Sequence, residues 1–488
     1  MRVASITGPP VVALLLAACQ GGSIQIDAED SASTPDVPSD SDTDTDTDTD
    51  TDADTDTDTD ADTDADTDAD TDTDSGDPAL VDLDAWIGDI PTAPRVSWTL
   101  TATGDTWIEF HDGDEDWHQA PVHTDTTGAQ ETSILGVTEA TEVTWRAVAE
   151  VDGDRIESAE QTITTGDIPS WVPQTLVWTH DEDEASPEGY ILGGMCDNAF
   201  RWYFYVMNRD GDYVWFYELP SFHWGLYART SRGRPTVLLT DAPSWWAGNE
   251  VAQILEFSLS GTIVEVHETD GLNHAFAETD SGLAWPAKDG STEDLVQRAY
   301  GGSTEVVWDA TPWFNSVGMS ASNRSNALHW HEATDTYLYS WYDPETVIEV
   351  DRSTGNVLRV FGNAVPDSYT FEPRNSAFEY QHHPVYTDEG TLLVMSTGDG
   401  VAREYVVDDD ARTLVQVWEY DVPGVQGGQI GEASRLPNGN TLINMGTFPL
   451  ILEVNEDKDV LYELEWPEGG WLGSTVLIDD VYDFCPDC

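Results

Sequence analysis

The segment RSNALHWHEATDTYLYSWYDPETVIEVDRSTGNVLRVFG, residues 324–362, decides the fold class. Apolar and polar residues alternate over Thr336–Trp341, Thr346–Val350 and Val357–Phe361, and Asp, Pro and Gly residues occupy the short segments between these runs. Such alternation, bounded by turn residues, predicts short strands joined by tight turns. No helical period competes with it, so the segment predicts an all-β fold.

The same strand–turn–strand phrase recurs along the C-terminal part of the chain. Turns of this kind are spaced by about 45 to 55 residues, and they lie around Asp210, Gly261, Gly355, Asp409 and Asp457, with a partial copy at Val306–Trp308. A second hairpin phrase lies between them, at Asp280–Trp285, Asp335–Ser340, Asp388–Val394 and Pro437–Ile443. Two hairpins per repeat make four strands, which is the content of one propeller blade. We expect a six-bladed β-propeller over residues 169–488, because an irregular β-sandwich would not need a fixed period.

A smaller β domain is expected before the propeller, over residues 86–168. Its alternating runs are Arg95–Thr101, Thr106–Phe110, Glu131–Leu135, Val143–Ala149 and Gln161–Thr165. This spacing predicts a small β-sandwich. The segment Leu135–Trp145 resembles the turn before a late strand of fibronectin type III domains. Since the domain carries no cluster of reactive side chains, we interpret it as a structural adaptor.

The N-terminal segments predict export and anchoring. Residues 1–18 contain a short apolar run, Val11–Ala18, which is too short to span a bilayer and is typical of a signal peptide. The run ends at Leu16–Cys19, which resembles a lipobox, so Cys19 is the expected lipidation site; a plain secretory signal is the alternative. The expected location is the cell envelope, lipid-anchored at the outer membrane on its periplasmic or surface-exposed face.

Residues 19–85 predict a disordered linker. Asp occupies every even position from Asp40 to Asp74, alternating with Thr, Ala or Ser. Such a segment cannot bury apolar surface, and its like charges extend it. We interpret it as a spacer. A divalent-cation tail is the alternative, but the glycine turns of calcium loops are missing.

The whole chain has a formal net charge of −75, with only 19 lysines and arginines. A surface this acidic repels nucleic acid and anionic lipid, so neither is an expected partner, and the membrane is reached through the lipid anchor alone. Any site for an anion must therefore concentrate the few histidines and arginines locally.

Cysteine usage fits an exported protein. With Cys19 lipidated, Cys196, Cys485 and Cys488 remain as disulfide candidates, and one thiol is left over. A bond from Cys196 to Cys485 or Cys488 would help to close the propeller ring. Cys485-Pro-Asp-Cys488 could instead be a redox pair or half of a metal site. Because no second CxxC exists in the sequence, we expect no metal.

The combination of a fibronectin-like domain and a six-bladed propeller resembles the bacterial arylsulfotransferases. The phrases Tyr337–Gly355, Gln381-His382 and Leu436–Ile443 carry the resemblance. Enzymes of this family move a sulfuryl group from an aryl sulfate to a phenol through a covalent sulfohistidine, without a nucleotide donor. The resemblance therefore implies a transferase without cofactors, with a site in the central channel and with an aryl sulfate and a phenol as small-molecule partners.

The resemblance also implies the site residues. His382 matches the nucleophile of the family, and a neutral imidazole can attack sulfur and leave again. His274 matches a second active-site histidine. The sulfate oxygens need cationic donors and the phenol needs a proton relay. The expected catalytic residues are His382, His274 and Arg324, and the expected substrate-binding residues are Asn326, Tyr342 and Gln381.

Two of these positions depart from the family. Arg324 replaces a histidine, and its guanidinium can bind sulfate oxygens but cannot release a proton to act as a relay. Tyr342 replaces an arginine, so one cation is lost and one hydrogen-bond donor remains. His329, His331 or His383 could restore proton transfer, although the strand pattern does not place them in the channel.

Structural roles remain as alternatives. His382 could cap or pack the start of a blade, Arg324 could lie on a surface loop, and Asn326 and Gln381 could bond backbone groups between blades. The alternative function is a non-catalytic surface propeller that binds a ligand or partner. A quinone-dependent dehydrogenase is disfavoured, since those enzymes resemble eight-bladed rings with a regular Trp phrase in each blade.

Overall fold

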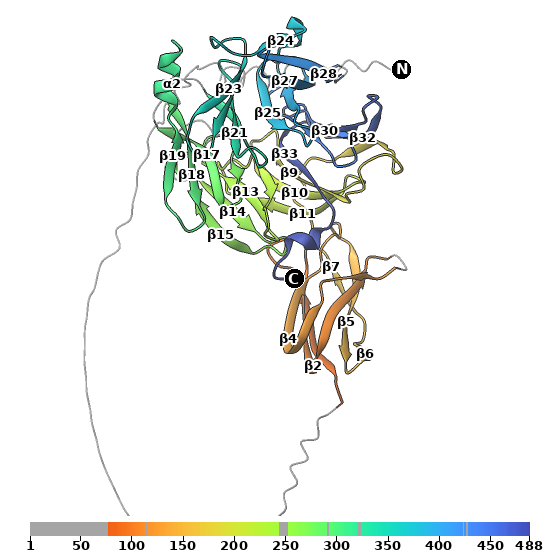
Figure 1. Ribbon diagram of the computed structural model, residues 1–488. Helices are drawn as coiled ribbons and strands as arrows, with labels where there is room; N and C mark the ends of the chain where they lie inside the picture. Colours follow the sequence, from red (N-terminus) through yellow and green to blue (C-terminus); the bar gives the residue numbers. More distant parts are fainter. Residues whose placement is uncertain are drawn as a thin grey trace, which may run out of the picture. The chain divides into compact units, whose positions relative to one another are not determined.

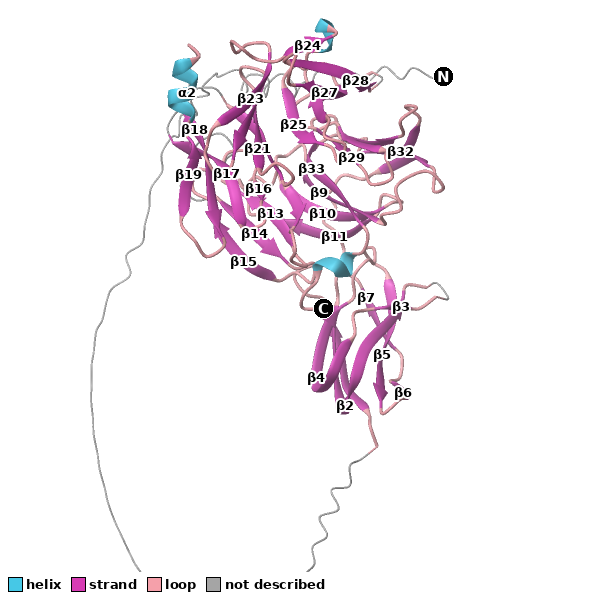
Figure 2. Cartoon of the chain, in the orientation of Figure 1, coloured by secondary structure: helices cyan, strands magenta, loops and turns pink. Residues whose placement is uncertain are grey.

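The computed structural model describes residues 77–113, 116–243, 252–289, 292–320, 324–422, 424–425 and 428–488. The predicted signal peptide, the lipidation site Cys19 and the Asp-rich linker up to residue 76 lie outside these residues. Within them the chain is built almost entirely of strands, with one short helix, α2 (Ala310–Ser316), and two 3-10 turns, η1 (Arg374–Ser376) and η2 (Val481–Phe484) (Figure 1, Figure 2). None of the described helices has the length and apolarity that crossing a bilayer requires.

A small β domain precedes the propeller. Its strands are β1 (Leu80–Trp86), β2 (Arg95–His111), β3 (His118–Gln119), β4 (His123–Ser133), β5 (Glu142–Val151), β6 (Asp154–Glu157) and β7 (Gln161–Thr164). The first half of β2 pairs with β1 and β4, and its second half pairs with β5 and β3. Apolar side chains from both halves enclose one core, which includes Trp98, Ile108 and Trp145. The likeness to fibronectin type III domains stays a prediction.

The structure corrects one element of this domain. The sequence predicted two strands, Arg95–Thr101 and Thr106–Phe110, but β2 is continuous across Gly104-Asp105. The register against β4 shifts on both sides of Gly104, and β5 begins to pair with the strand at Asp105 while β4 still pairs with it as far as Thr106. A side chain at Gly104 would collide with the Glu150 carbonyl. The glycine therefore permits a close strand crossing rather than a turn.

The prediction of an all-β, six-bladed propeller is confirmed, because the remaining strands form six antiparallel sheets. From the channel outward, blade 1 comprises β33 (Trp471–Ile478), β9 (Tyr190–Cys196), β10 (Trp202–Asn208) and β11 (Tyr213–Glu218). Blade 2 comprises β12 (Ala228–Thr230), β13 (Val237–Asp241), β14 (Gln253–Phe257) and β15 (Ile263–Glu268). Blade 3 comprises β16 (Ala277–Glu278), β17 (Gly282–Asp289), β18 (Thr292–Ala299) and β19 (Thr304–Trp308).

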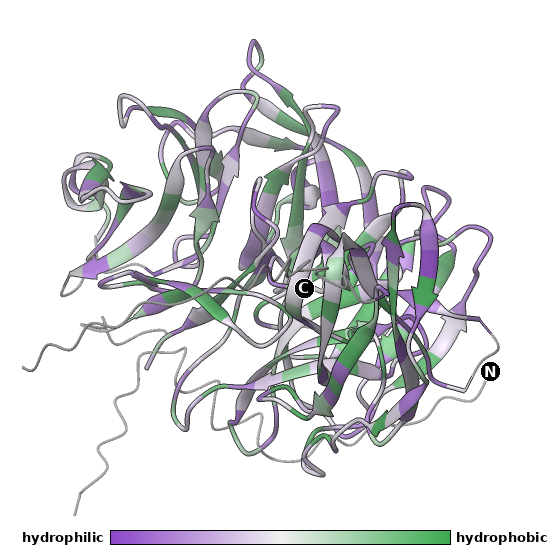
Figure 3. Ribbon diagram, turned by 90° about the horizontal axis from the view of Figure 1, so that it is seen from below, coloured by the Kyte–Doolittle hydropathy of each residue, from purple (hydrophilic) through white to green (hydrophobic). Residues whose placement is uncertain are grey.

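The other three blades follow the same plan. Blade 4 comprises β20 (Ser325–His331), β21 (Thr336–Trp341), β22 (Thr346–Asp351) and β23 (Val357–Gly362). Blade 5 comprises β25 (Gln381–Tyr386), β26 (Leu392–Ser396), β27 (Val401–Asp408) and β28 (Thr413–Asp421), with β24 (Thr370–Glu372) parallel to β28. Blade 6 comprises β29 (Glu432–Arg435), β30 (Thr441–Asn444), β31 (Leu450–Val454), β32 (Val460–Glu465) and β8 (Leu176–His180). Apolar segments run along the strands, and many connecting turns are hydrophilic (Figure 3).

Two strands far apart in the sequence close the ring. The C-terminal strand β33 pairs with β9 as the innermost strand of blade 1, and β8 pairs with β32 at the outer edge of blade 6. Backbone hydrogen bonds at both ends of the propeller thus hold blades 1 and 6 together. This closure needs no covalent bond.

The predicted bond between Cys196 and a C-terminal cysteine is wrong. Cys485 is bonded to Cys488, and Cys196 is a free thiol, buried at the end of β9. Burial raises the pKa of Cys196, and the charge of Asp197 raises it further. The thiol is therefore packed as an apolar group. The ring closes through strand pairing instead.

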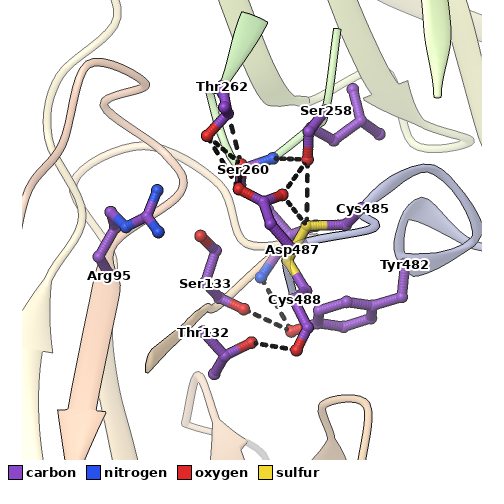
Figure 4. The surroundings of a disulfide bond; sticks show 12 residues. Arg95, Thr132, Ser133, Ser258, Ser260, Thr262, Tyr482, Cys485, Asp487 and Cys488 are labelled. Atoms are coloured by element: carbon purple, nitrogen blue, oxygen red, sulfur yellow. Dashed lines mark hydrogen bonds between the residues drawn. A yellow bond between two sulfur atoms is a disulfide. The ribbon is translucent and has the colours of Figure 1, made fainter. Parts of the chain in front are cut away.

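The C-terminal tail links the small domain to blade 2 (Figure 4). The Tyr482 hydroxyl donates to the Ser133 carbonyl and accepts from the Leu135 amide, each at 3.1 Å. Asp487 accepts hydrogen bonds of 2.8 Å from Ser260 and Thr262, in the turn between β14 and β15. The Cys485–Cys488 disulfide closes a short loop that contains Asp487 and begins three residues after Tyr482.

Candidate active site

The predicted catalytic residues lie at the starts of inner strands. In a propeller the first strand of each sheet faces the central channel. His274 lies three residues before β16, Arg324 directly before β20, and His382 second in β25. These are the inner strands of blades 3, 4 and 5, and β20 contacts both β16 and β25.

His274, Arg324 and His382 lie near enough to one another for their charges to interact. Burial, together with the nearby charges of His382, Arg324 and Lys288, lowers the pKa of His274 to about 3. The ring of Tyr342 belongs to the same group, because its centroid lies 6.2 Å from the His382 ring and 5.6 Å from the Arg324 guanidinium carbon. Four of the six predicted site residues therefore form one cluster from three consecutive blades.

His382 is held as a neutral imidazole with a defined tautomer. Its Nδ1 lies 3.1 Å from the Tyr380 carbonyl oxygen and 3.2 Å from the Thr397 hydroxyl. A carbonyl oxygen only accepts, so Nδ1 carries the proton and the lone pair of the neutral ring is on Nε2. Burial lowers the pKa of His382 to about 4, although the Tyr380 hydrogen bond and the charge of Glu432 act in the opposite direction. At neutral pH, Nε2 is therefore unprotonated and carries a lone pair.

Arg324 contributes one cation to this cluster, and the charge of Lys288 also acts on His274. Its Nη2 lies 3.1 Å from an Asp343 carboxylate oxygen, and the two side chains are 29% and 49% exposed. The Arg324 carbonyl accepts a 2.8 Å hydrogen bond from the Tyr342 amide, which extends the pairing of β20 and β21 to the end that carries both residues. An ion pair with this exposure contributes roughly 0–1 kcal/mol. An incoming anion can therefore displace Asp343 at little cost.

Asn326 and Gln381 lie in the seam between blades 4 and 5 rather than in this cluster. Both are buried. Asn326 Nδ2 donates to the Gln381 carbonyl at 2.6 Å. Gln381 Nε2 donates to the Ser340 hydroxyl at 2.9 Å and to the Trp341 carbonyl at 3.0 Å. These contacts fit the alternative of bonding between blades, and they also fix the backbone that carries His382.

A second group of ionisable residues lies on the inner strands beside the predicted cluster. Glu432 opens β29 and accepts from Arg229 Nη2 of β12 at 2.5 Å and from the Thr475 amide of β33 at 2.9 Å. His383 Nε2 lies 3.9 Å from a Glu432 oxygen, and the ring centroids of His383 and His329 are 6.2 Å apart. These residues come from five inner strands, and together they form one network of charges and hydrogen bonds. The strands are β12, β20, β25, β29 and β33.

Sequence reasoning missed Arg229, Glu432 and Thr475, and it did not place His329 and His383. A usable signal was present for Glu432, which lies five residues before the Pro437 hairpin, much as His382 lies six residues before the Asp388 hairpin. Aligning the repeats on their inner hairpins would have put both residues at a strand start. Arg229 lies in a blade whose inner hairpin lacks the repeated phrase.

Two groups among the described residues bring metal-binding side chains close together, and neither includes the clustered residues above. One consists of Cys485, Asp487 and Cys488, where the sulfurs are joined in a disulfide. The other consists of Glu256, Glu265 and His267. The guanidinium of Arg234 already pairs with Glu256 there. Neither arrangement argues for a metal centre.

Comparisons with known proteins leave the family open. No protein-family model matches the sequence, and no curated protein matches it. A protein of unknown function from Bacteroides caccae is similar over 60% of this chain and 100% of its own, with 12% identity and a TM-score of 0.43. A catalytically inactive virginiamycin B lyase from Staphylococcus aureus, solved with quinupristin, is similar over 62% of this chain and 99% of its own, with 8% identity and a TM-score of 0.39. Such values support no assignment of function, and the resemblance to arylsulfotransferases stays a prediction.

Proposed function

We propose that this protein transfers a sulfuryl group from an aryl sulfate to a phenol, with His382 as the covalent nucleophile. The observation that carries the proposal is the convergence of His274, Arg324 and His382 from three inner strands. One neutral imidazole with its lone pair on Nε2 and one guanidinium beside it meet the needs of sulfuryl transfer, namely a nucleophile and a cation for the sulfate oxygens.

In the first half-reaction, the His382 Nε2 lone pair forms a bond to sulfur. The bond between sulfur and the aryl oxygen breaks, and the phenolate leaves with the electron pair. Arg324 stabilises the sulfate oxygens, and Tyr342 offers a ring face and a hydroxyl donor. In the second half-reaction, a phenol takes the group from His382.

The proposal includes a place in the cell. The protein is taken to be an exported lipoprotein of the cell envelope, anchored through Cys19 and held away from the membrane by the Asp-rich linker. Its partners are then the aryl sulfate, the phenol and, through the anchor, the outer membrane. Palmitate labelling of the wild type and of Cys19→Ala in a bacterial host tests the anchor.

The activity is tested by incubating the full-length chain with 4-nitrophenyl sulfate and a phenol. We expect nitrophenol release that depends on the acceptor, and a sulfuryl adduct that peptide mass spectrometry locates at His382. The variant His382→Ala should lose both. His180→Ala is the matched control, since His180 lies on the outermost strand of blade 6. A folded wild type with neither release nor adduct, for several donors, contradicts the proposal.

A non-catalytic binding propeller is the second candidate. It is favoured by the Arg324–Asp343 ion pair, in which a carboxylate offsets the guanidinium charge, and by Tyr342 in place of an arginine. Saturable binding of an aryl sulfate, measured by calorimetry with no product formed, would support this function over the transferase.

A further inference from the structure

His382 and His383 are consecutive, yet the charge of Glu432 acts on both imidazoles. Neighbouring residues in a regular strand point to opposite faces. Here the register of β25 against β26 shifts between His382 and Val385, and His383 has a φ of 47°. A bulge of this kind redirects one side chain. The charge of Glu432 raises the pKa of His382, and His383 Nε2 lies 3.9 Å from a Glu432 oxygen.

Both ring nitrogens of His383 face groups that only accept. Nδ1 lies 3.3 Å from the Ala433 carbonyl oxygen, so this nitrogen carries the proton of the neutral ring. Nε2 then has the lone pair and lies 3.9 Å from a Glu432 oxygen, too far for a hydrogen bond. A proton that arrives on Nε2 makes the ring a cation, and the nearby carboxylate charge stabilises that cation.

Glu432 is held in its ionised form. Burial acts to raise its pKa, but the charge of Arg229 and the hydrogen bonds from Arg229 and the Thr475 amide outweigh burial, so the pKa lies below its usual value. Arg229 and Thr475 occupy different oxygens of the carboxylate. The negative charge of Glu432 is therefore fixed in position. A residue that orients a proton acceptor needs a charge fixed in this way.

The surroundings of His383 explain why it is neutral at rest. Burial lowers its pKa, Arg229 lowers it further, and Glu432 acts in the opposite direction. The ring of His329 faces it from β20, and burial together with the charges of His383, Arg229, His331 and Arg232 lowers the pKa of His329 to about 3. His383 thus starts without a proton and has a fixed anion ready for the protonated form.

We propose that His383 is the proton acceptor of the second half-reaction and that Glu432, held by Arg229, is its positioning residue. The proposal rests on the proposed function. It supplies the proton relay that Arg324 cannot provide, because a guanidinium does not release its proton.

The step balances as follows. The acceptor phenol gives its hydroxyl proton to His383 Nε2 while its oxygen forms the new bond to sulfur. The bond between sulfur and His382 Nε2 breaks, and the electron pair returns to Nε2. The products are an aryl sulfate, a neutral His382 and a protonated His383 beside Glu432, and the proton then passes to water.

The test separates the two half-reactions in the full-length protein. The first is followed as the burst of nitrophenol from 4-nitrophenyl sulfate without acceptor, and the second as decay of the adduct on adding phenols of different acidity. In His383→Gln the burst should stay within about threefold of the wild type, and transfer to unsubstituted phenol should fall by about 10²-fold. Transfer to pentafluorophenol, already ionised at neutral pH, should fall by less than about threefold, because no proton has to move.

Glu432→Gln is the second variant, and it should show the same dependence on acceptor acidity with a smaller loss. His180→Gln is the control, and near-UV circular dichroism checks folding. Equal slowing with every phenol means that His383 is structural and overturns the relay, as does an unchanged rate with unsubstituted phenol. A wild type that forms no adduct overturns the proposed function instead, and the relay with it.

Discussion

The two sides of the channel hold their arginines differently. On blade 4, Arg324 pairs with Asp343, and the two side chains are 29% and 49% exposed. On blades 2 and 6, Arg229 pairs with Glu432, and the side chains are 24% and 6% exposed. The nitrogen–oxygen distance is 3.1 Å in the Arg324 pair and 2.5 Å in the Arg229 pair, and the Asp343 carboxylate is far more exposed to solvent than that of Glu432.

This difference distinguishes the two arginines. An anionic substrate can replace the exposed partner of Arg324, whereas the charge of Arg229 is already paired with a buried carboxylate. Breaking a solvated pair costs little, whereas removing one partner of a buried pair leaves an uncompensated charge. We infer that an anionic substrate is bound on the Arg324 side. On the Arg229 side, the Glu432 carboxylate stays ionised, and this side is therefore suited to proton transfer.

The largest effect is expected from Arg229→Gln. Loss of this guanidinium leaves the Glu432 carboxylate buried with the Thr475 amide, which should lower the free energy of unfolding by about 3–5 kcal/mol. Urea denaturation followed by tryptophan fluorescence measures it. Arg412→Gln, at an exposed arginine in the turn after β27, is the matched control. A loss no larger than that of the control would show that the two sides do not differ as proposed.

Arg324→Gln should give the opposite pattern. Its effect on the free energy of unfolding should stay below about 1 kcal/mol, since the pair with Asp343 is exposed. The rate of sulfuryl transfer should fall by about 10²–10³-fold, equivalent to about 3–4 kcal/mol of transition-state stabilisation. Arg324→Lys keeps the charge and should recover part of the rate. Steady-state kinetics and urea denaturation of the same samples check both. A variant that is strongly destabilised and fully active would reverse the assignment of the two sides.

The blades were predictable from the sequence because their turns are local. The repeated turns at Asp210, Gly261, Gly355, Asp409 and Asp457 all connect the third and fourth strands of a blade, counted from the channel. A tight turn needs particular residues at particular positions, so it is visible in a short window. Ring closure was missed, because β33 and β8 pair with strands that lie hundreds of residues away, and no local pattern marks such partners.

The site was predictable only in part. His274, Arg324 and His382 were identified through the resemblance, and the fold brings them together. His383 could not be placed, since a strict strand alternation puts it on the opposite face from His382. The bulge and the positive φ that redirect it depend on packing against β29 and β26, and the QHHP sequence alone does not reveal them.

The smallest effect concerns protonation of His382, and it tests whether the Arg324 side works with a neutral imidazole. The folded-state pKa of His382 is about 4, below the usual value of about 6.5 in an unfolded chain. Between these values the unfolded chain binds a proton that the folded protein does not, so stability should fall as pH decreases from 6.5 toward 4. The slope from this residue is about 1.4 kcal/mol per pH unit.

His382→Gln should flatten the dependence of the unfolding free energy on pH by that amount, as measured by urea denaturation from pH 7 to about pH 4.5. In the wild type, the rate of adduct formation should stay constant over this range and fall only as pH passes through about 4. An acid limb centred near 6.5 would mean that the ring is solvated, and the contrast between a neutral nucleophile on one side and a fixed charge pair on the other would then be lost.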